Sequence, residues 1–472
     1  MMNNLSPSCM KKNALASDAS PLRRPGLTLA TLCFAMLIAQ LDTSVVNLAT
    51  RPIGAQFHAG VSALQWVIDG YNLTYAVLLL TGGLLADLYG RRRVFMAGAA
   101  VFTAASLLCA AAPSISILIA GRVLTGIGAA LMLPASLAVV RVAWPDRKAR
   151  ARALGIFTGT NGLAFIIGPT VGGLLIDQFG WRSIFFVVVP FGIAALALSP
   201  AVVPESADPD GRHFDAPAQL LGIGALGGLA LAAIEAHEHG LAAGVALAVS
   251  IAALILFLRV EAKRGDGALV PLDMFRRREF TGAITATAGM TFGMYGLLFL
   301  LMLTWQSSGR LGAVGAGLAL VPMAAIFVLV SPFSGALGHR VGDRLMTGAG
   351  VAIIGCGVIL AGLSAGQSSL LLPEIGLCMA GLGMGLATGP LTHVAVSAVS
   401  VARSGTAAAL LNVARMVGAT VGVAVLGAVY AFAEGGTEGL HIALCLGGAV
   451  QLLTAFVALA NIPSRHKATA AE

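Results

Sequence analysis

The chain is poor in charge: Asp, Glu, Lys and Arg make up 11% of its 472 residues, whereas soluble domains carry roughly 25%. Its six cysteines are scattered and include no C-x-x-C pair, so neither a disulfide framework nor a metal site is expected. A phosphate-binding loop of the form G-x-x-x-x-G-K-[ST] is absent as well. These absences argue against a soluble protein, a metalloprotein and an ATP-driven pump, and we expect no cofactor.

The feature that is abundant is apolar sequence. Hydrophobic residues make up 57% of the chain, and a helix that crosses a bilayer needs about 20 of them in succession. Fourteen apolar runs are long enough: 27–49, 62–87, 94–112, 115–140, 153–176, 183–203, 218–236, 240–258, 281–305, 312–337, 346–364, 370–396, 404–431 and 439–461. The sequence therefore predicts an all-α integral membrane protein with fourteen transmembrane helices, surrounded by the lipid bilayer.

Positive charges predict the orientation, because Lys and Arg are held back on the cytoplasmic side of a membrane. With both termini inside, almost all of the 29 Lys and Arg residues fall in cytoplasmic segments; the exceptions are Arg51, Arg182 and Arg310 outside and Arg122 and Arg415 within helices. We therefore expect a multi-pass protein of the cell inner (cytoplasmic) membrane with both termini in the cytoplasm. These loops also account for the net charge of +8, so no nucleic-acid partner is expected.

An internal repeat predicts the domain organisation. The segment Gly335–Arg344 repeats two glycines, a leucine and an arginine of Gly83–Arg92. We expect two six-helix bundles with two extra helices inserted between them. The expected boundaries are a cytoplasmic tail at 1–25, an N-terminal bundle at 26–203, a linker with the two extra helices at 204–258, a cytoplasmic loop at 259–280, a C-terminal bundle at 281–462 and a cytoplasmic tail at 463–472.

A basic turn between the second and third apolar runs is the first candidate for function. It contains Gly83, Asp87, Gly90, Arg91 and Arg92. Gly90 can adopt a positive φ at the turn, and Asp87 at the helix end can interact with the positive N-terminus of another helix. One interpretation is an ordinary cytoplasmic loop that sets the topology, and the other is a motif that switches conformation.

Three charged residues inside apolar runs are the second candidate. Asp42, Asp69 and Arg122 all lie roughly 10–12 Å below the outer boundary, counted at about 1.5 Å per helical residue. A charge at mid-bilayer costs about 2.5–3.5 kcal/mol on insertion scales and is usually paired or functional. The three residues are either a static ion pair that joins helices or a proton-coupling site. If Arg122 neutralises Asp42, then Asp69 is the better proton carrier.

A stretch rich in glycine and proline in the fifth run is the third candidate. Pro169 removes a backbone donor and bends the helix. Gly168, Gly172 and Gly173 permit close contact with a neighbouring helix. Such residues can serve helix packing alone or can take part in transport.

Three more polar residues are candidates for lining a central cavity: Asn47, Tyr71 and Arg415. Arg415 lies deep in its apolar run. There it can face the cavity or satisfy backbone carbonyl groups at a helix contact, and the sequence favours neither.

Several of these motifs resemble those of a known family. The pattern G-x-x-x-D-x-x-G-R-R at Gly83–Arg92 resembles the loop signature of the major facilitator superfamily, except that Leu88 stands where that family usually has Arg or Lys. The segments Leu41–Ala49, Arg122–Ala130 and Gly168–Gly173 resemble motifs of its fourteen-helix drug:proton antiporter branch. The resemblance implies a monomeric, proton-coupled antiporter that exports drugs or other small amphipathic or cationic compounds by alternating access. Its partners would be the small-molecule substrate and protons.

Other functions compete with this one. Export of one specific metabolite or antibiotic, for self-resistance, is the main alternative, since the substrate is set by cavity-facing side chains. A membrane-embedded enzyme would need His, Asp or Glu clustered at a helix end, and His393 and His441 stand alone. A transporter-like protein without transport activity need not keep costly charges in its helices. We therefore expect a transporter and not an enzyme.

Overall fold

The computed structural model describes residues 24–207, 215–264, 268, 270–367, 369–400 and 403–463. Within these ranges, fourteen helical segments are long and apolar enough to cross a membrane, which confirms the number expected from the sequence. The same ranges contain no strand, so the fold is all-α. The expected tails at 1–25 and 463–472 lie almost entirely outside the described residues.

The first six apolar runs form six spans. They are α2 (Pro25–Phe57), α3 (Val61–Tyr89), α4 (Arg91–Ala111), α5 (Ile115–Ala143), α6 (Arg147–Phe179) and a sixth span made of α7 (Ser183–Phe186) and α8 (Val189–Val202). The start of α6 is capped by Asp146, whose carboxylate accepts a hydrogen bond from the Ala149 N–H at 2.7 Å. The run expected as a single helix at 183–203 is interrupted after Phe186, because Pro190 has no N–H to donate to that carbonyl.

The remaining spans follow in the second part of the chain. They are α9 (Ala216–Glu235), α10 (Gly240–Arg264), α11 (Arg278–Ser307), α12 (Ala313–Val341), α13 (Asp343–Leu363), α14 (Leu371–Ser397), α15 (Ser404–Phe432) and α16 (Gly436–Asn461), with the short 3₁₀ helix η2 (Leu272–Arg276) before α11. The turn between α12 and α13 repeats the turn between α3 and α4, since Gly342 has a φ of 108° and Gly90 a φ of 106°. The repeat in the sequence is therefore also a repeat of backbone geometry.

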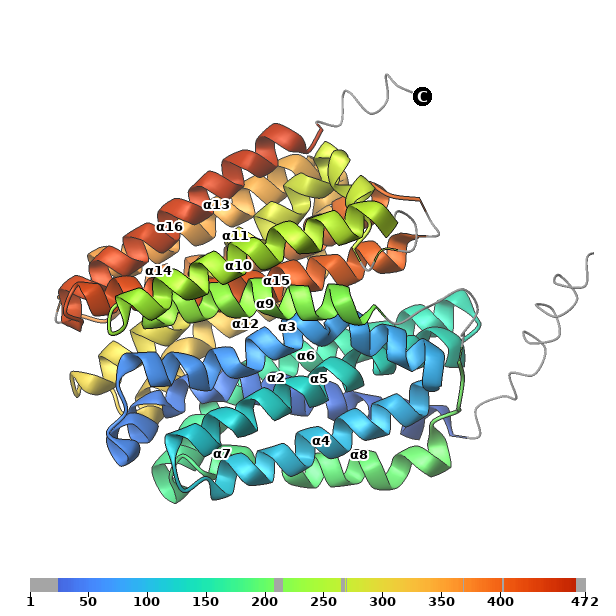
Figure 1. Ribbon diagram of the computed structural model, residues 1–472, viewed down its shortest axis with the longest axis horizontal. Helices are drawn as coiled ribbons and strands as arrows, with labels where there is room; N and C mark the ends of the chain where they lie inside the picture. Colours follow the sequence, from blue (N-terminus) through green and yellow to red (C-terminus); the bar gives the residue numbers. More distant parts are fainter. Residues whose placement is uncertain are drawn as a thin grey trace, which may run out of the picture.

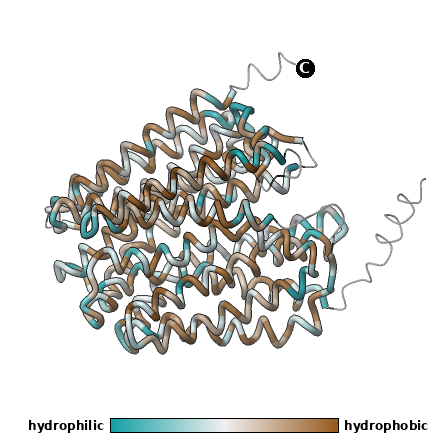
Figure 2. The backbone as a smooth tube through the Cα atoms, in the orientation of Figure 1, coloured by the Kyte–Doolittle hydropathy of each residue, from teal (hydrophilic) through white to brown (hydrophobic). Residues whose placement is uncertain are grey.

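The helices lie side by side along one direction (Figure 1). The blue and teal helices of the first half lie together, as do the orange and red helices of the second half. Helix α9 packs against both α3 and α15, and α10 packs against α9. Apolar residues follow the helices along their lengths, while hydrophilic residues gather toward the ends (Figure 2). We call the end that holds the start of α2 and the end of α16 the tail end, and the opposite one the far end.

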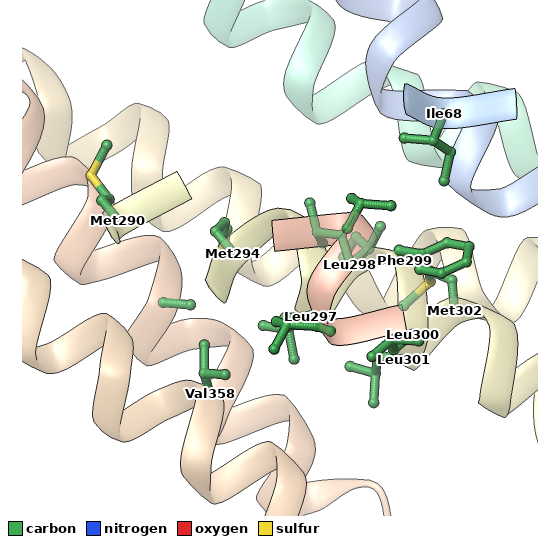
Figure 3. Packing of buried hydrophobic residues seen from close by; sticks show 14 of the residues in the cluster. Ile68, Met290, Met294, Leu297, Leu298, Phe299, Leu300, Leu301, Met302 and Val358 are labelled. Atoms are coloured by element: carbon green, nitrogen blue, oxygen red, sulfur yellow. The ribbon is translucent and has the colours of Figure 1, made fainter. Parts of the chain in front are cut away.

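Helix α11 is the most buried of the spans. Its residues Met290, Met294 and Leu297–Met302 belong to one apolar cluster with Ile68 of α3 and Val358 of α13 (Figure 3). Many other large apolar side chains are exposed on the outside of the helices, Leu241 of α10 at 87% among them. An apolar core beneath an apolar surface is what a lipid-embedded bundle requires.

The two halves contact each other at the far end. The Gln65 side chain on α3 donates hydrogen bonds to the carbonyl oxygens of Val423 and Ala424 on α15, at 2.8 and 3.0 Å. The Gln306 side chain on α11 donates to the carbonyl oxygen of Leu48 on α2 at 3.1 Å. All five residues are buried. In this structure the far end is therefore closed.

Candidate functional site

Asp42 of α2 and Arg122 of α5 form a buried ion pair. The Arg122 Nη1 lies 2.6 Å from the Asp42 Oδ2, and only 2% and 1% of the two side chains are exposed. The same guanidinium donates from Nε to the Val67 carbonyl oxygen at 2.8 Å and lies 4.8 Å from the centre of the Tyr71 ring. The pair therefore joins α2, α3 and α5 and cancels both charges. The sequence did not reveal the contribution of Val67, because a backbone acceptor carries no residue signature.

Glycine allows α3 and α5 to approach closely enough for this arrangement. A Cβ atom at Gly126 of α5 would lie 2.6 Å from the Tyr71 carbonyl oxygen, and real Cβ atoms essentially never lie within 3.0 Å of such an atom. A Cβ atom at Gly70 of α3 would already touch Arg122 and Val123. A larger side chain at Gly126 would thus push the Tyr71 ring away from the guanidinium.

Asp69 is fully buried but lies apart from the ion pair. Neither of its carboxylate oxygens has a hydrogen-bond partner among the described residues. The Asn72 side chain lies next to it without a hydrogen bond of regular geometry, and both amide atoms of Asn72 also lack partners. Gln65, four residues earlier and therefore on the same face of α3, contacts α15. Of the three charges predicted to cluster, the structure brings two together and places the third on the face of α3 that Gln65 presents to the other half.

A small cavity lies beside the ion pair. Its lining comes from both halves: Thr43, Val46, Asn47, Ile68, Tyr71, Asn72, Arg122 and Tyr295. Asn47 and Tyr71, two of the three residues predicted for a cavity, are in this lining, and Asp69 is not. Asn72 connects the two places, since it lines the cavity and adjoins Asp69. Sequence reasoning missed Asn72 and Tyr295; a polar residue three positions after Asp69 was the available signal for the first.

The basic turn is anchored to the segment that follows α8. Asp87 Oδ1 accepts hydrogen bonds from Arg91 Nη2 at 2.8 Å and Nε at 3.1 Å. The Arg92 N–H donates to Glu205 Oε1 at 3.1 Å, and the Arg92 Nε lies 3.7 Å from Glu205 Oε2. Gly90 has the positive φ predicted for it. Glu205 was not predicted, although an acid directly after the sixth apolar run, opposite three arginines, was a signal for it.

Of the two adjacent glycines Gly82 and Gly83, the first makes the close helix contact. A Cβ atom at Gly82 would clash with the Ala130 carbonyl oxygen of α5, whereas one at Gly83 would meet Pro134 only at 3.7 Å, an ordinary contact. Both positions lie in α3. Gly82 therefore sets the distance between α3 and α5, and Gly83 does not.

The glycines of α6 divide between two neighbours. Cβ atoms at Gly168 and Gly172 would clash with the side chains of Ser44 and Val45 on α2, in the same half. A Cβ atom at Gly173 would lie 2.8 Å from the Ala313 carbonyl oxygen at the start of α12, in the other half. Pro169 lies inside α6. The stretch therefore packs α6 within its own half and also against the opposite one.

Comparisons with known proteins bear on the chain as a whole. The family model described as Major Facilitator Superfamily matches residues 32–423. The multidrug resistance protein Stp of Mycobacterium tuberculosis is 38% identical over 409 residues, which cover 86% of this chain and 76% of the relative. The methylenomycin A resistance protein of Bacillus subtilis is 33% identical over 452 residues, covering 94% of this chain and 95% of the relative.

Solved structures show the same fold. The peptide transporter POT in complex with sulfate has a TM-score of 0.72 at 14% identity, covering 95% of this chain and 97% of that one. A bacterial homologue of the human lysosomal transporter Spinster, in an inward-facing and unoccupied conformation, has a TM-score of 0.64 at 18% identity, covering 93% and 95%. At such identities the likeness concerns the architecture alone.

Proposed function

The chain belongs to the Major Facilitator Superfamily of membrane transporters, and we propose that it is a proton-coupled antiporter that exports drugs or other small amphipathic compounds by alternating access. Relatives that match most of its length are named as multidrug and antibiotic resistance proteins. The observation that carries the proposal is Asp69, a carboxylate that is wholly buried and has no hydrogen-bond partner among the described residues. Burying an ionised carboxylate without a partner costs free energy, and binding a proton removes that cost. Protonation of Asp69 therefore changes the stability of the conformation in which it is buried.

Proton exchange is assigned to Asp69 and not to Asp42. Arg122 neutralises Asp42 at 2.6 Å, so a proton on Asp42 would leave the guanidinium buried and unpaired. No cation among the described residues forms an ion pair with Asp69. In the proposed cycle Asp69 takes a proton from the acidic side when the far end is open, and loses it toward the tail end. Asn72, which adjoins Asp69 and lines the cavity, is the contact through which proton binding and substrate binding influence each other.

The basic turn is assigned to the conformational switch. We place the tail end in the cytoplasm, with both chain termini, in the inner (cytoplasmic) membrane, and expect a monomer. When the tail end closes, the Asp87 carboxylate, at the end of α3, is expected to interact with the start of α15 near Ser404, where the N-terminus of the helix is positive. Gly83 precedes Asp87 in α3, and Gly90, Arg91 and Arg92 form the turn into α4; we assign all of them to this switch.

The test is efflux from proteoliposomes with and without an imposed pH gradient. A resistance and accumulation screen against cationic, neutral and acidic drugs first selects a transported compound and also shows whether export is broad or limited to one antibiotic. Asp69→Asn should abolish uphill efflux but retain downhill exchange, because a permanently neutral side chain mimics the protonated state. Asp177→Asn, which removes an exposed carboxylate of α6, is the matched control and should transport normally.

If Asp69→Asn still concentrates the compound against its gradient, Asp69 is not the proton carrier, and Asp42 becomes the next candidate. If the wild-type protein moves substrate but no protons, coupling to a different ion has to replace the proton in the proposal.

A further inference from the structure

Arg415 of α15 is a membrane-embedded cation with no counter-charge among the residues that the structure describes. Its side chain is half-buried, and its Nε is fully buried and has no hydrogen-bond partner among those residues. Among the described residues, no carboxylate forms an ion pair with it and no carbonyl oxygen accepts a hydrogen bond from its guanidinium. The interpretation that Arg415 satisfies backbone carbonyls at a helix contact therefore has no support. Its own carbonyl oxygen accepts a hydrogen bond from the Thr291 hydroxyl of α11 at 2.8 Å, which fixes the backbone at this position.

Two tyrosines from different halves lie within electrostatic range of this guanidinium. Tyr75 of α3 and Tyr295 of α11 are its electrostatic neighbours, and both are half-buried, as Arg415 is. Tyr295 also lines the cavity beside the ion pair, whereas Arg415 itself is not among the lining residues. Asn47 Oδ1 in that cavity has no hydrogen-bond partner among the described residues. The region thus combines an unused cation, two hydroxyl groups and a free polar acceptor.

The charges of the lining favour an anion. Arg122 is neutralised by Asp42, so it attracts no further negative charge. The residues that line the cavity include no carboxylate, and Asp69 lies outside that lining. Arg415 also lies outside the lining, but its guanidinium is charged at every relevant pH, whereas Asp69 is neutral when it carries the proton of the proposed cycle. A negatively charged compound therefore has a permanent counter-charge in this region, and a positively charged one does not. In a low-dielectric environment this difference is much larger than it is in water.

We propose that Arg415, assisted by the hydroxyl groups of Tyr75 and Tyr295, binds a carboxylate group of the transported compound. The planar guanidinium can donate two parallel hydrogen bonds to a carboxylate, and each tyrosine hydroxyl can donate one more. In this structure the cavity has a volume of about 10 Å³, room for about one water molecule, so apolar side chains such as Val46 and Ile68 would contact the rest of the compound once the halves move apart around it. This proposal rests on the proposed export function and specifies it: the preferred substrates are amphipathic acids.

Binding of three naphthalene probes to the purified full-length protein tests the proposal. Naphthoate, naphthamide and naphthylmethylammonium share one apolar body and differ in charge. Dissociation constants are taken from ligand-dependent thermal shifts at neutral pH. In the wild-type protein, naphthoate should bind at least about tenfold more tightly than naphthamide, the difference expected of a charge-assisted hydrogen bond, and the ammonium compound should bind most weakly.

Variants identify the residue responsible. Arg415→Gln should reduce the preference for naphthoate to less than about twofold, and Arg415→Lys should retain part of it. Tyr295→Phe should weaken naphthoate more than naphthamide. Arg51→Gln, at an exposed arginine of α2, is the matched control and should bind as the wild type does.

Two results would overturn the proposal: equal binding of naphthoate and naphthamide by the wild-type protein, or an unchanged preference in Arg415→Gln. If Arg415→Gln fails to fold, the wild-type comparison, Arg415→Lys and Tyr295→Phe still decide. The acid preference should persist in Asp69→Asn, because that residue lies outside the cavity lining. Loss of proton-driven transport can therefore be distinguished from loss of acid recognition.

Discussion

Of two adjacent glycines of α6, only Gly173 should affect the conformational equilibrium when it is replaced by alanine, and Gly172 should not. A Cβ atom at Gly173 would lie 2.8 Å from the Ala313 carbonyl oxygen in the other half, against an ordinary contact of at least 3.4 Å. A Cβ atom at Gly317 of α12 would clash even more closely, with the Pro169 carbonyl oxygen. Both clashes involve backbone atoms across the closed far end, so Gly173→Ala and Gly317→Ala should each disfavour the state described above.

The expected size follows from the cost of overpacking. Extra methyl groups in a packed interior cost about 1–3 kcal/mol, and about 1.4 kcal/mol corresponds to a tenfold change in an equilibrium constant. The far-end-closed population should therefore fall by a factor of about 5 to 150 relative to the open one. Gly172→Ala is the matched control, because the three atoms nearest to its methyl group would all belong to the Val45 side chain, within the same half. That clash is present in both states and leaves their ratio unchanged.

Alkylation of a buried thiol measures this population. Leu48 lies at the closed far end and is 0% exposed, so Leu48→Cys in a cysteine-free background should react slowly with a maleimide in the purified protein. Gly173→Ala should accelerate the reaction and Gly172→Ala should not. Equal rates in these two variants, or a slower reaction in Gly173→Ala, would refute the assignment of Gly173 to the contact between halves.

Three further predictions concern the ion pair, the far-end contact and the orientation. Asp42→Asn should lower the free energy of unfolding by about 3–5 kcal/mol, because the Arg122 charge stays buried without its partner; an unchanged Tm contradicts this. Gln65→Ala removes two hydrogen bonds between the halves, each worth about 0.5–1.5 kcal/mol. The thiol of Leu48→Cys should therefore react about tenfold faster with the maleimide in this variant. An unchanged rate would show that other contacts keep the far end closed. Arg276→Cys, exposed at the tail end, should resist impermeant thiol reagents in intact cells and react after permeabilisation; labelling in intact cells would place the tail end outside.

The spans could be predicted from the sequence because their length and apolarity are properties of single segments. The number of fourteen helices and the all-α fold were obtained in this way and are confirmed. The interruption after Phe186 was not predicted, although Pro190 lacks the N–H group that would donate to the Phe186 carbonyl oxygen. Counting apolar residues detects the length of a span but not the loss of one backbone hydrogen bond within it.

Side-chain direction could not be predicted, and this limited the candidate site. Depth along a helix can be counted in steps of about 1.5 Å, which brought Asp42, Asp69 and Arg122 to one level. Each residue also turns by about 100° around the axis, so the partner of a side chain depends on which helix lies on that side. Asp69 consequently lies on the face that carries Gln65, apart from the ion pair. The same difficulty applies to Gly82 and Gly83, since only the first of these adjacent glycines is in close contact with α5.

Helix α9 is hydrogen-bonded to the first half, whereas its contact with the second half is by packing against α15. At the far end the Ser62 hydroxyl of α3 donates to Glu238, just beyond α9, at 3.2 Å, and toward the tail end the Gln219 side chain of α9 donates to the Val77 carbonyl oxygen at 3.2 Å. Ser250 of α10 in turn donates to a carbonyl oxygen of α9 at 2.6 Å. Against α15, no hydrogen bond from α9 occurs among the described residues. When the two halves move relative to each other, α9 and α10 should therefore move together with the first half. The two moving bodies would then be unequal, one of eight helices and one of six, and they would slide past each other along the contact between α9 and α15.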